Sequence, residues 1–464
     1  MSGILGSLEI ARKALWASRL GLDVTSQNIA NVNTPGYSRQ RVDLTPSNPV
    51  NLGFGPLGTG VLVKRISRAR VDLIDRNLRD AYTRQGYGQA QETVLMQLDS
   101  VYNEPSENGL AYQITDFFNE WSNLASNPED SSARQILMQK SVKLAATFRD
   151  TTNKLHTMRK SIESQVSGEV RDLNQILKDL ASVNGKIVNA EIGGTSANDL
   201  RDMRDKLVDE LAKFGKVTFS EDSRGSSNIN LEGVTVVTGT DYQEFTYAVE
   251  NNDLGVKELH LKLKSTGEIF NSTTGKLGSY VYQFNELIPE QLDNLDQIAS
   301  SLITEVNKIH SKSYGLPQGS PPTASTGFDF FTGGDAASIR INKNVEEDLN
   351  KIAISVSGEP GDAEGALAIS NLSNKKMFGN RTQTINEFYQ TMISKLGNQI
   401  DDAQSIIAQQ DLVVGQLESQ KDSISGVNLD EEMINLTKFQ RSFEAASKVI
   451  KTVDEMMQTI LTLK

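Results

Sequence analysis

Residues 4–37 read ILGSLEIARKALWASRLGLDVTSQNIANVNTPGY, and this stretch decides how the N-terminal end folds. Large aliphatic side chains recur in it every seven positions, at Leu8, Leu15, Leu22 and Ile29. The positions between them on the same face are small, at Ala11, Ser18 and Thr25. A seven-residue period is typical of a long helix that packs on other helices, and small side chains allow close approach. The stretch predicts one uninterrupted helix over residues 4–31.

The end of this stretch, ANVNTPGY (30–37), predicts an abrupt helix stop. Thr34 precedes a proline and is therefore pushed out of the helical region. Pro35-Gly36 suits the centre of a type II turn, in which glycine supplies a positive φ. We predict a rigid helix-exit turn made by Asn31, Asn33, Thr34, Pro35, Gly36 and Tyr37. Local chemistry alone leaves an ordinary helix stop as the alternative.

The C-terminal end repeats the seven-residue period. Its large side chains fall on two positions of one helix face, at Leu429, Leu436, Phe439, Phe443, Ile450, Val453, Met457 and Ile460. Glu432 interrupts the pattern, and we interpret it as an acidic residue suited to the helix N-terminus. Together with Leu8, Leu15, Leu22 and Ile29, these residues form the predicted self-assembly site, which we call the seam.

Between the two ends the chain is mostly helical by pattern. Prolines are absent from 129–288, so helices can run uninterrupted there. The predicted helices cover 68–103, 109–125, 131–191, 196–214, 281–309 and 381–420. Pro289 predicts a break or kink in the fifth of them, and Ser196 with Asp199 reads as a capping box at the start of the fourth.

Residues 216–276 have a different period. Phe245, Tyr247 and Val249 alternate with polar residues, and so do Leu259 and its neighbours, which predicts short antiparallel strands. A further hairpin is expected near 335–357, and 314–327 reads as a loop. The predicted fold class is mainly α, a long helical bundle or coiled coil built from both chain ends and the helical middle, with a small inserted antiparallel β-domain.

The predicted domain organisation is discontinuous. Residues 1–67 and 425–464 form a terminal coiled-coil polymerisation domain, 68–215 and 277–424 form a long-helix bundle, and 216–276 form the inserted β-domain.

Composition excludes several classes of function. The 464 residues include no cysteine, which excludes disulfides and thiolate metal sites. The net charge of −12 disfavours nucleic acid and anionic membrane as partners. No apolar run is long enough to cross a membrane, and Glu9 interrupts the start, so we expect no cleaved signal peptide. The basic cluster at Lys64, Arg65, Arg68 and Arg70 reads as a solvated face.

No enzyme site is apparent either. The only histidines, His156, His260 and His310, are far apart in sequence and read as core or surface residues. The glycine-rich residues 53–60 do not follow a strand and open a helix, as a phosphate loop would. We therefore expect no catalytic residues, no cofactor and no metal site.

Two periodic helices at opposite ends of a chain, together with the exit turn, resemble the axial proteins of the bacterial flagellum, the rod, hook and hook-associated proteins. Residues 18–40, SRLGLDVTSQNIANVNTPGYSRQ, are similar to their shared N-terminal motif. Residues 423–457, 109–148 and 198–211 resemble the hook-associated members. Rod and hook proteins carry mainly β middles, whereas this chain is helical there.

The resemblance implies a structural adaptor between hook and filament, outside the cell at the hook–filament junction and exported unfolded by the flagellar type III apparatus. Implied partners are further copies of the chain in a helical ring or tube, the hook protein, the next hook-associated protein and a secretion chaperone on the C-terminal helix. The seam and the exit turn would carry assembly, and we expect both termini to fold only on assembly. The small residues Ala11, Ser18 and Thr25 would leave room for neighbouring copies.

Two alternatives remain open at this point. One is another flagellar axial protein of hook or rod type. The other is a self-associating helical scaffold whose β-insert carries an enzymatic activity.

Overall fold

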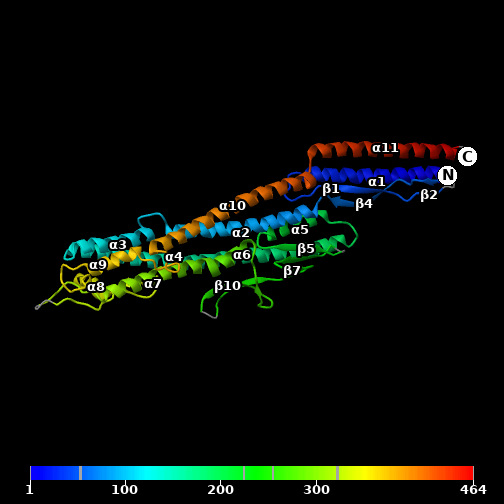
Figure 1. Cartoon of the computed structure of the whole chain (residues 1–464). Coiled ribbons are helices and arrows are strands. Elements are labelled where there is room, and N and C mark those ends of the chain that lie inside the picture. The colour runs from blue at the N-terminus through cyan, green and yellow to red at the C-terminus, as the bar shows by residue number, and fades with distance from the viewer. Residues whose placement is uncertain (1, 52–54, 223–224, 253–254, 320–322, 463–464) are drawn as a thin grey trace.

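The structure is a computed structural model that describes residues 2–51, 55–222, 225–252, 255–319 and 323–462. The molecule is elongated and mainly α-helical, with small antiparallel sheets (Figure 1). Both chain ends lie at one extremity, and a helical bundle forms the rest of its length (Figure 1). The predicted fold class is confirmed.

The terminal part consists of two helices and a hairpin. Helix α1 (Ser2–Ala30) and helix α11 (Leu429–Thr462) lie side by side and run in opposite directions (Figure 1). Strands β1 (Gln40–Pro46) and β4 (Val61–Arg68) pair antiparallel and pack on α1. Their connection holds the short pair β2 (Val50–Asn51) and β3 (Pro56–Leu57). Of the glycine-rich residues 53–60, 53 and 54 lie outside the described residues.

Seven helices of at least 8 residues make up most of the described bundle. They are α2 (Asp72–Tyr102), α3 (Leu110–Ser126), α4 (Ser131–Glu191), α5 (Asn198–Leu211), α6 (Gly275–Tyr282), α7 (Ile288–His310) and α10 (Ile385–Ser425). Asp130 caps α4 by accepting from the Ser132 amide at 2.8 Å. Thr384 and Glu387 form a capping box at the start of α10, which fixes where that helix begins.

The bundle core is aromatic at the end away from the termini. Phe117, Trp121 and Phe330 are fully buried, and the rings of Trp121 and Phe330 pack edge to face on the imidazole of His310. Nδ1 of His310 lies 2.7 Å from the Phe328 carbonyl, and its Nε2 accepts from the Ala353 amide at 2.9 Å. Burial lowers the pKa of His310 to about 4, so the ring is neutral. The prediction of a satisfied core histidine is confirmed here.

The predicted break near Pro289 is also confirmed. Residues Gln283–Leu287 form a π-helical turn between α6 and α7, and Pro289 lies in the first turn of α7. Proline has no amide hydrogen and cannot continue the α-helical bonding pattern from α6. The wider turn accommodates this while the helical direction continues.

The β region contains two small sheets. Strands β5 (Val217–Glu221), β6 (Ser227–Leu231), β7 (Val234–Thr238) and β8 (Asp241–Tyr242) form one. Strands β9 (Phe245–Asn251), β10 (Lys257–Leu263) and β11 (Ile269–Phe270) form the other.

The register of β9 and β10 confirms the predicted alternation, because Phe245 lies opposite Leu263 and Val249 opposite Leu259. The ends of the region meet, since the Lys276 amide donates to the Lys213 carbonyl at 2.9 Å. Its buried side chains, however, belong to the same continuous core as the bundle. A separate β-domain over 216–276 therefore stays a prediction.

Two local predictions were wrong. The two segments expected to pair near 335–357 do not pair with each other. Instead β13 (Arg340–Ile341) pairs with β12 (Phe331–Thr332), because Asn342 caps the short helix α8 (Lys343–Glu347) directly afterwards. Ser355 bridges to Tyr314, within the predicted loop 314–327. Residues 320–322 of that loop lie outside the described residues.

The capping box at Ser196 is the second error. Helix α5 begins one residue later, with Ala197 at its N-cap and no side-chain cap. Asp199 instead accepts from Gln40 at 2.8 Å and from Gln27 at 3.2 Å. Its carboxylate therefore connects α5 to the terminal part.

Candidate self-assembly site

The structure brings the two halves of the predicted seam together along α1 and α11. Leu8, Leu15, Leu22 and Ile29 on α1 are half-buried, as are Leu436, Phe439, Phe443 and Ile450 on α11. Val453 is buried, whereas Leu429, Met457 and Ile460 remain exposed. The pairing thus leaves part of every large seam side chain except Val453 accessible. A role of these residues in self-assembly remains a prediction.

The sequence analysis expected the small residues of α1 to leave room for neighbouring copies. The structure shows instead that they are buried within the chain. Ala11, Ser18 and Thr25 are only 4%, 5% and 2% exposed within the chain itself. They occupy the face of α1 against which α11 and the hairpin pack. Small side chains are needed there because the partners of one and the same chain approach closely.

Gly21 marks a close approach between the two terminal helices. A Cβ atom on Gly21 would lie 2.6 Å from the ring of Phe439. Substitution of Gly21 by alanine is therefore expected to force α1 and α11 apart. We expect protease cleavage within 429–462 to accelerate about tenfold, which corresponds to ~1.4 kcal/mol of opening free energy.

Gly6→Ala is the matched control, because the same helix has open space around Gly6. The double variant Gly21→Ala with Phe439→Leu should regain part of the lost protection, since leucine lacks the ring. Equal cleavage rates for Gly21→Ala and Gly6→Ala would contradict the proposed close contact.

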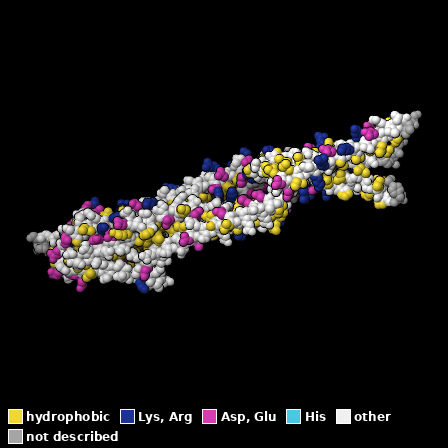
Figure 2. All heavy atoms as spheres, turned by 90° about the horizontal axis from the view of Figure 1, so that it is seen from above, with side chains coloured by type: hydrophobic (Ala, Val, Ile, Leu, Met, Phe, Trp, Pro, Cys, Tyr) yellow, Lys and Arg dark blue, Asp and Glu magenta, His cyan; other side chains and the backbone are white. Residues whose placement is uncertain are grey.

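The terminal part has little core of its own. The continuous hydrophobic cores contain no residue of α1, the hairpin or α11 among the described residues. Large apolar side chains are instead exposed, such as Trp16 at 59% and Ile434 at 69%. Figure 2 shows hydrophobic side chains gathered at this end of the molecule, with Lys and Arg beside them. An exposed apolar surface of this kind is typical of a protein–protein interface.

The helix-exit turn has the predicted geometry. Gly36 has a φ of +86°, and the Tyr37 amide donates to the Thr34 carbonyl at 3.2 Å. The Tyr37 hydroxyl donates to Oδ1 of Asn28 at 2.8 Å. Asn28 is fully buried, and its Oδ1 also accepts from the Gln40 amide at 3.0 Å. The turn is therefore folded back onto the last part of α1.

Of the other turn residues, Asn31 directly follows the last residue of α1, and Pro35 is exposed. The Asn31 amide donates to the carbonyls of Gln27 and Asn28, at 3.1 and 3.2 Å. Asn33 is exposed.

The interpretation of Glu432 as an acidic residue that merely suits the helix N-terminus needs correction. Its carboxylate is buried and makes specific hydrogen bonds. Its side chain is 2% exposed. It accepts from Nδ2 of Asn28 at 3.0 Å and from Nε of Arg39 at 2.8 Å. The carboxylate therefore ties the start of α11 to the exit turn of α1.

The prediction that Lys64, Arg65, Arg68 and Arg70 form a solvated basic face was wrong for two of these four residues. Lys64 and Arg65 are exposed, but the side chains of Arg68 and Arg70 are only 14% and 10% exposed. Nη1 of Arg68 lies 2.7 Å from a carboxylate oxygen of Asp202 and 2.8 Å from one of Asp205. Arg70 pairs with Asp205 as well. These ion pairs join the end of the hairpin to helix α5.

Helix α2 extends the same charged cluster. Arg70 pairs with Asp75 at 2.7 Å, and Arg79 pairs with Asp209 at 2.7 Å. Lys421 from the end of α10 reaches the same two carboxylates, at 3.3 and 3.2 Å. We call Arg68, Arg70, Arg79, Asp75, Asp202, Asp205, Asp209 and Lys421 the joint.

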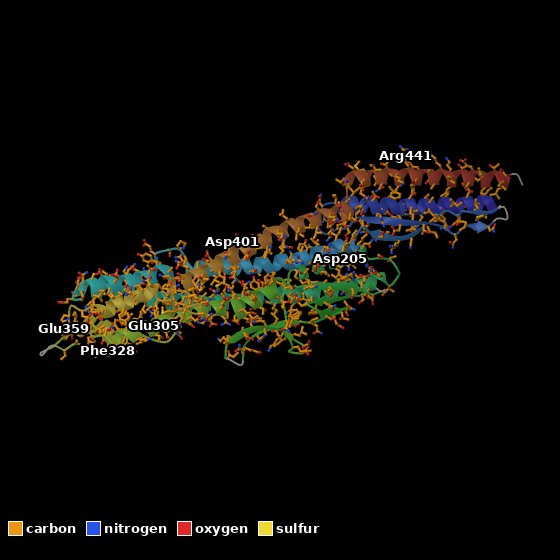
Figure 3. The ribbon with its side chains drawn as sticks, viewed as in Figure 1. Asp205, Glu305, Phe328, Glu359, Asp401 and Arg441 are labelled. Carbon is orange, nitrogen blue, oxygen red and sulfur yellow. The ribbon has the colours of Figure 1, made fainter. Side chains whose placement is uncertain are left out.

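Electrostatics within the joint favour the ionised state of its acids. Burial alone would raise the pKa of Asp205, but the nearby guanidinium groups of Arg70 and Arg68 outweigh this and lower it. The same balance, with Arg70 as the main partner, lowers the pKa of Asp75. Figure 3 places Asp205 where the bundle meets the terminal part.

Further polar contacts cross this junction. Ser38 donates to Asp202 from its amide at 2.9 Å and from its hydroxyl at 2.7 Å. Nδ2 of Asn198 donates to Oε1 of Gln40 at 3.0 Å. Hydrogen bonds and ion pairs, rather than a shared apolar core, therefore set the direction of the terminal part.

Sequence reasoning missed the joint, although a signal was present. Asp199, Asp202, Asp205 and Asp209 recur at helical spacing in 198–211 and so fall on one face of α5. An acidic stripe of this kind ordinarily faces solvent. Here it faces arginines from a distant part of the chain.

Chemistry other than assembly finds little support. Within the ranges that the structure describes, no three His, Cys, Asp or Glu side chains group so as to hold a metal ion. None of the helices in those ranges has the length and hydropathy to cross a membrane. A cavity of about 700 Å³ lies beside the joint, but arginines paired with carboxylates form much of its wall.

Comparison with protein families gives three matches. The model of the flagellar hook-associated protein FlgK helical domain matches residues 95–331. The model of the flagella basal body rod protein matches residues 8–37, which comprise most of α1 and the exit turn. The model of the flagellar basal body rod FlgEFG protein C-terminal region matches residues 419–463.

Curated relatives match over nearly the whole chain. Flagellar hook-associated protein 1 of Bacillus subtilis is 28% identical, over 99% of this chain and 98% of its own length. The protein of the same name from Escherichia coli is 27% identical, over 98% and 99%. The solved flagellar hook junction protein FlgK from Burkholderia pseudomallei superposes with a TM-score of 0.64 at 15% identity, over 75% of this chain and all of its own. The last match supports the fold alone.

Proposed function

The chain belongs to the flagellar hook-associated protein FlgK family of flagellar axial components, and from that premise we propose that it joins hook to filament by assembling with its own copies through α1 and α11. One observation carries this proposal. Residues 8–37 and 419–463, which match the axial rod families, lie at opposite ends of the sequence and side by side in space. Their seam is only partly covered within one chain.

The proposed partners follow from this arrangement. The exposed parts of the seam would contact further copies of the chain in a helical ring or tube, with the hook protein on one side and the next hook-associated protein on the other. Before assembly, a secretion chaperone would cover α11, which exposes Met433, Ile434 and Leu461. A chain without cysteine suits passage through an export channel in an unfolded state.

Immunogold electron microscopy of isolated flagella tests the location. An antibody against residues 131–191 should label one narrow zone between hook and filament, outside the cell. A strain that lacks the gene should make hooks without attached filaments. Label along the rod or along the whole filament would overturn the proposal and favour another type of axial protein.

The alternatives of the sequence analysis have less support. Residues 95–331 match a FlgK helical domain, whereas a hook or rod protein is expected to have a mainly β middle. An enzymatic insert is not favoured either, because the buried side chains of β6, β7, β9, β10 and β11 belong to the common core of the bundle. Since the family is structural, we propose that the chain has no catalytic activity.

Substitution of Gly36 by valine tests the exit turn as a functional element. Valine at a φ of +86° is strained by about 1–3 kcal/mol, so the turn should open and redirect α1. We expect the variant to be secreted at wild-type level while swimming on soft agar falls strongly. Gly397→Val is the matched control, because this glycine is exposed on α10 with open space around it. If Gly36→Val swims like the wild type, the turn only ends the helix and has no further role in function.

A further inference from the structure

The N-terminal segment has a charge opposite to that of the whole chain. Residues 1–67 carry seven basic and three acidic side chains, a net charge of +4, whereas the chain carries −12. Much of this positive charge lies on the β1–β4 hairpin. The hairpin projects from the joint along α1 and away from the bundle (Figure 1).

The pairing register defines an outer face of the hairpin. Asp43 lies opposite Arg65 and Thr45 opposite Leu62, and paired residues point to the same side of a sheet. Arg41 shares this face, since it is two positions from Asp43 along the strand. The alternate residues, such as Val42 and Ile66, form the half-buried face toward α1.

This outer face is basic and partly apolar. The side chains of Arg41 and Arg65 are 71% and 64% exposed and share one carboxylate, that of Asp43, at 3.3 and 3.1 Å. Lys64 is exposed as well. Leu62 is 45% exposed on the same face. The hairpin thus presents an exposed leucine beside guanidinium groups that a single acid does not neutralise.

The tip of the hairpin adds apolar surface. Val50 lies opposite Leu57 in the short β2–β3 pair, and each is 52% exposed. Arginines beside exposed aliphatic side chains are a composition favoured at protein interfaces.

A matching surface lies on the outer side of α10. Residues 396–420 contain four acidic residues and no basic one. Helix α10 packs mainly on α2, through buried residues such as Ala403, Gln410 and Val414. Its opposite side exposes Leu412 at 77%.

The acids on this stretch carry the complementary charge. Asp401 and Asp402 are exposed, and Figure 3 shows Asp401 in the middle of α10. Asp411 and Glu418 accept hydrogen bonds from Gln85 and Tyr82 of α2, at 2.6 Å each, and bring further negative charge. The stretch is therefore an acidic helix surface with exposed aliphatic side chains.

We propose that the outer face of the hairpin in one copy docks on the outer face of α10 in a neighbouring copy. Arg41, Lys64 and Arg65 would face the acids of α10, and the leucines Leu62 and Leu412 would pack between them. The inference rests on the proposed function, since it requires that copies assemble.

One chain cannot make this contact with itself, because its hairpin extends away from its own α10 (Figure 1). Two different surfaces meet in such a contact, so each copy retains a free hairpin or a free α10 for the next. Heterologous contacts of this kind build rings or open helical arrays instead of closed dimers.

Site-directed cross-linking tests the docking directly, since the natural chain has no cysteine. The variants Leu62→Cys and Leu412→Cys are purified separately, mixed in equal amounts and oxidised under conditions in which sedimentation shows assembly. We expect a covalent dimer in the mixture and none in either variant alone. Met96→Cys, at a side chain 54% exposed on α2, replaces Leu412→Cys as the matched control and should give no dimer with Leu62→Cys.

Charge reversal provides an independent measurement. Arg65→Glu should raise the protein concentration needed for assembly about tenfold, and so should Asp402→Lys. The double variant should return toward the wild-type value, because the two charges are again opposite.

The two proposals fail in different ways. Wild-type assembly without the mixed dimer, or equal cross-linking to Met96→Cys, overturns the docking but leaves assembly through α1 and α11. The docking is also overturned if the effects of Arg65→Glu and Asp402→Lys on the concentration needed for assembly simply add in the double variant. A wild-type chain that sediments as a monomer under all conditions overturns assembly itself.

Discussion

Backbone amides of α1 and α11 are expected to exchange with solvent at least about a hundredfold faster than those of α4 in dilute, monomeric protein. A hundredfold difference corresponds to ~2.7 kcal/mol of opening free energy. Both terminal helices are formed in the structure, but the buried side chains between them include small ones such as Ala11, Ala17 and Ala446. Helix α4, in contrast, buries Leu144, Phe148 and many others in the continuous core.

Hydrogen exchange with mass spectrometry at two protein concentrations measures this difference. Residues 2–30 and 429–462 should become protected when the protein assembles, whereas protection of 131–191 should not change. The α2 segment near Leu95 serves as an internal reference, since it is buried in the same core as α4. Slow exchange of both terminal helices in a verified monomer would refute folding on assembly.

Substitution of Asp205 by alanine is expected to lower the free energy of unfolding by about 3–5 kcal/mol. Asp205 is 8% exposed and pairs with both Arg68 and Arg70. Without its carboxylate, Arg68 keeps Asp202 and Arg70 keeps Asp75, but the four cations of the joint then face only three acids. An uncompensated buried charge costs far more than a lost surface ion pair. Chemical denaturation of the purified monomer measures the effect.

The exposed pair of Arg441 and Glu444 on α11 supplies the control, since Glu444→Ala should change the free energy of unfolding by less than ~0.5 kcal/mol. An equally small effect of Asp205→Ala would show that the joint does not stabilise the bundle. If hydrogen exchange shows that Asp205→Ala lowers the amide protection of α2 and α5 alone, the destabilisation is still located at the joint.

Acid should have a related effect. The pKa values of Asp205 and Asp75 lie below their unfolded values, so both groups stabilise the fold above the unfolded pKa. This stabilisation is lost as the pH falls through the folded pKa values. The wild-type protein should therefore lose stability below about pH 4, and Asp205→Ala should show a weaker dependence on pH in that range.

The regular elements were predictable because their signals are local. Helix α4 has the predicted bounds, since no proline interrupts it and Asp130 caps its start. The pairing of β9 with β10 follows from strict alternation around Val249 and Leu259. A break near Pro289 follows from the missing amide hydrogen of proline, although its π-helical form was not predicted.

The joint was not predictable, because its partners are distant in sequence. Arg68 and Asp202 are 134 residues apart, and each alone resembles a solvated surface charge. Glu432 likewise suits a helix start, and only the neighbouring Asn28 and Arg39 make it a buried contact. Small residues on α1 indicated close packing correctly, but a sequence cannot state whether the partner belongs to the same chain. For the seam itself, the pairing of α1 with α11 agrees with the expectation, whereas assembly remains to be measured.

The position of both chain ends at one extremity decides where a label can be attached. A fluorescent protein or affinity tag fused to either end would lie beside Leu8 or Ile460, within the predicted seam, and should block polymerisation. The opposite extremity holds Phe328 (Figure 3), and a side chain on the preceding Gly327 would meet open space. A short epitope inserted between Ser325 and Phe328 should therefore decorate assembled particles from outside and permit live imaging of their growth.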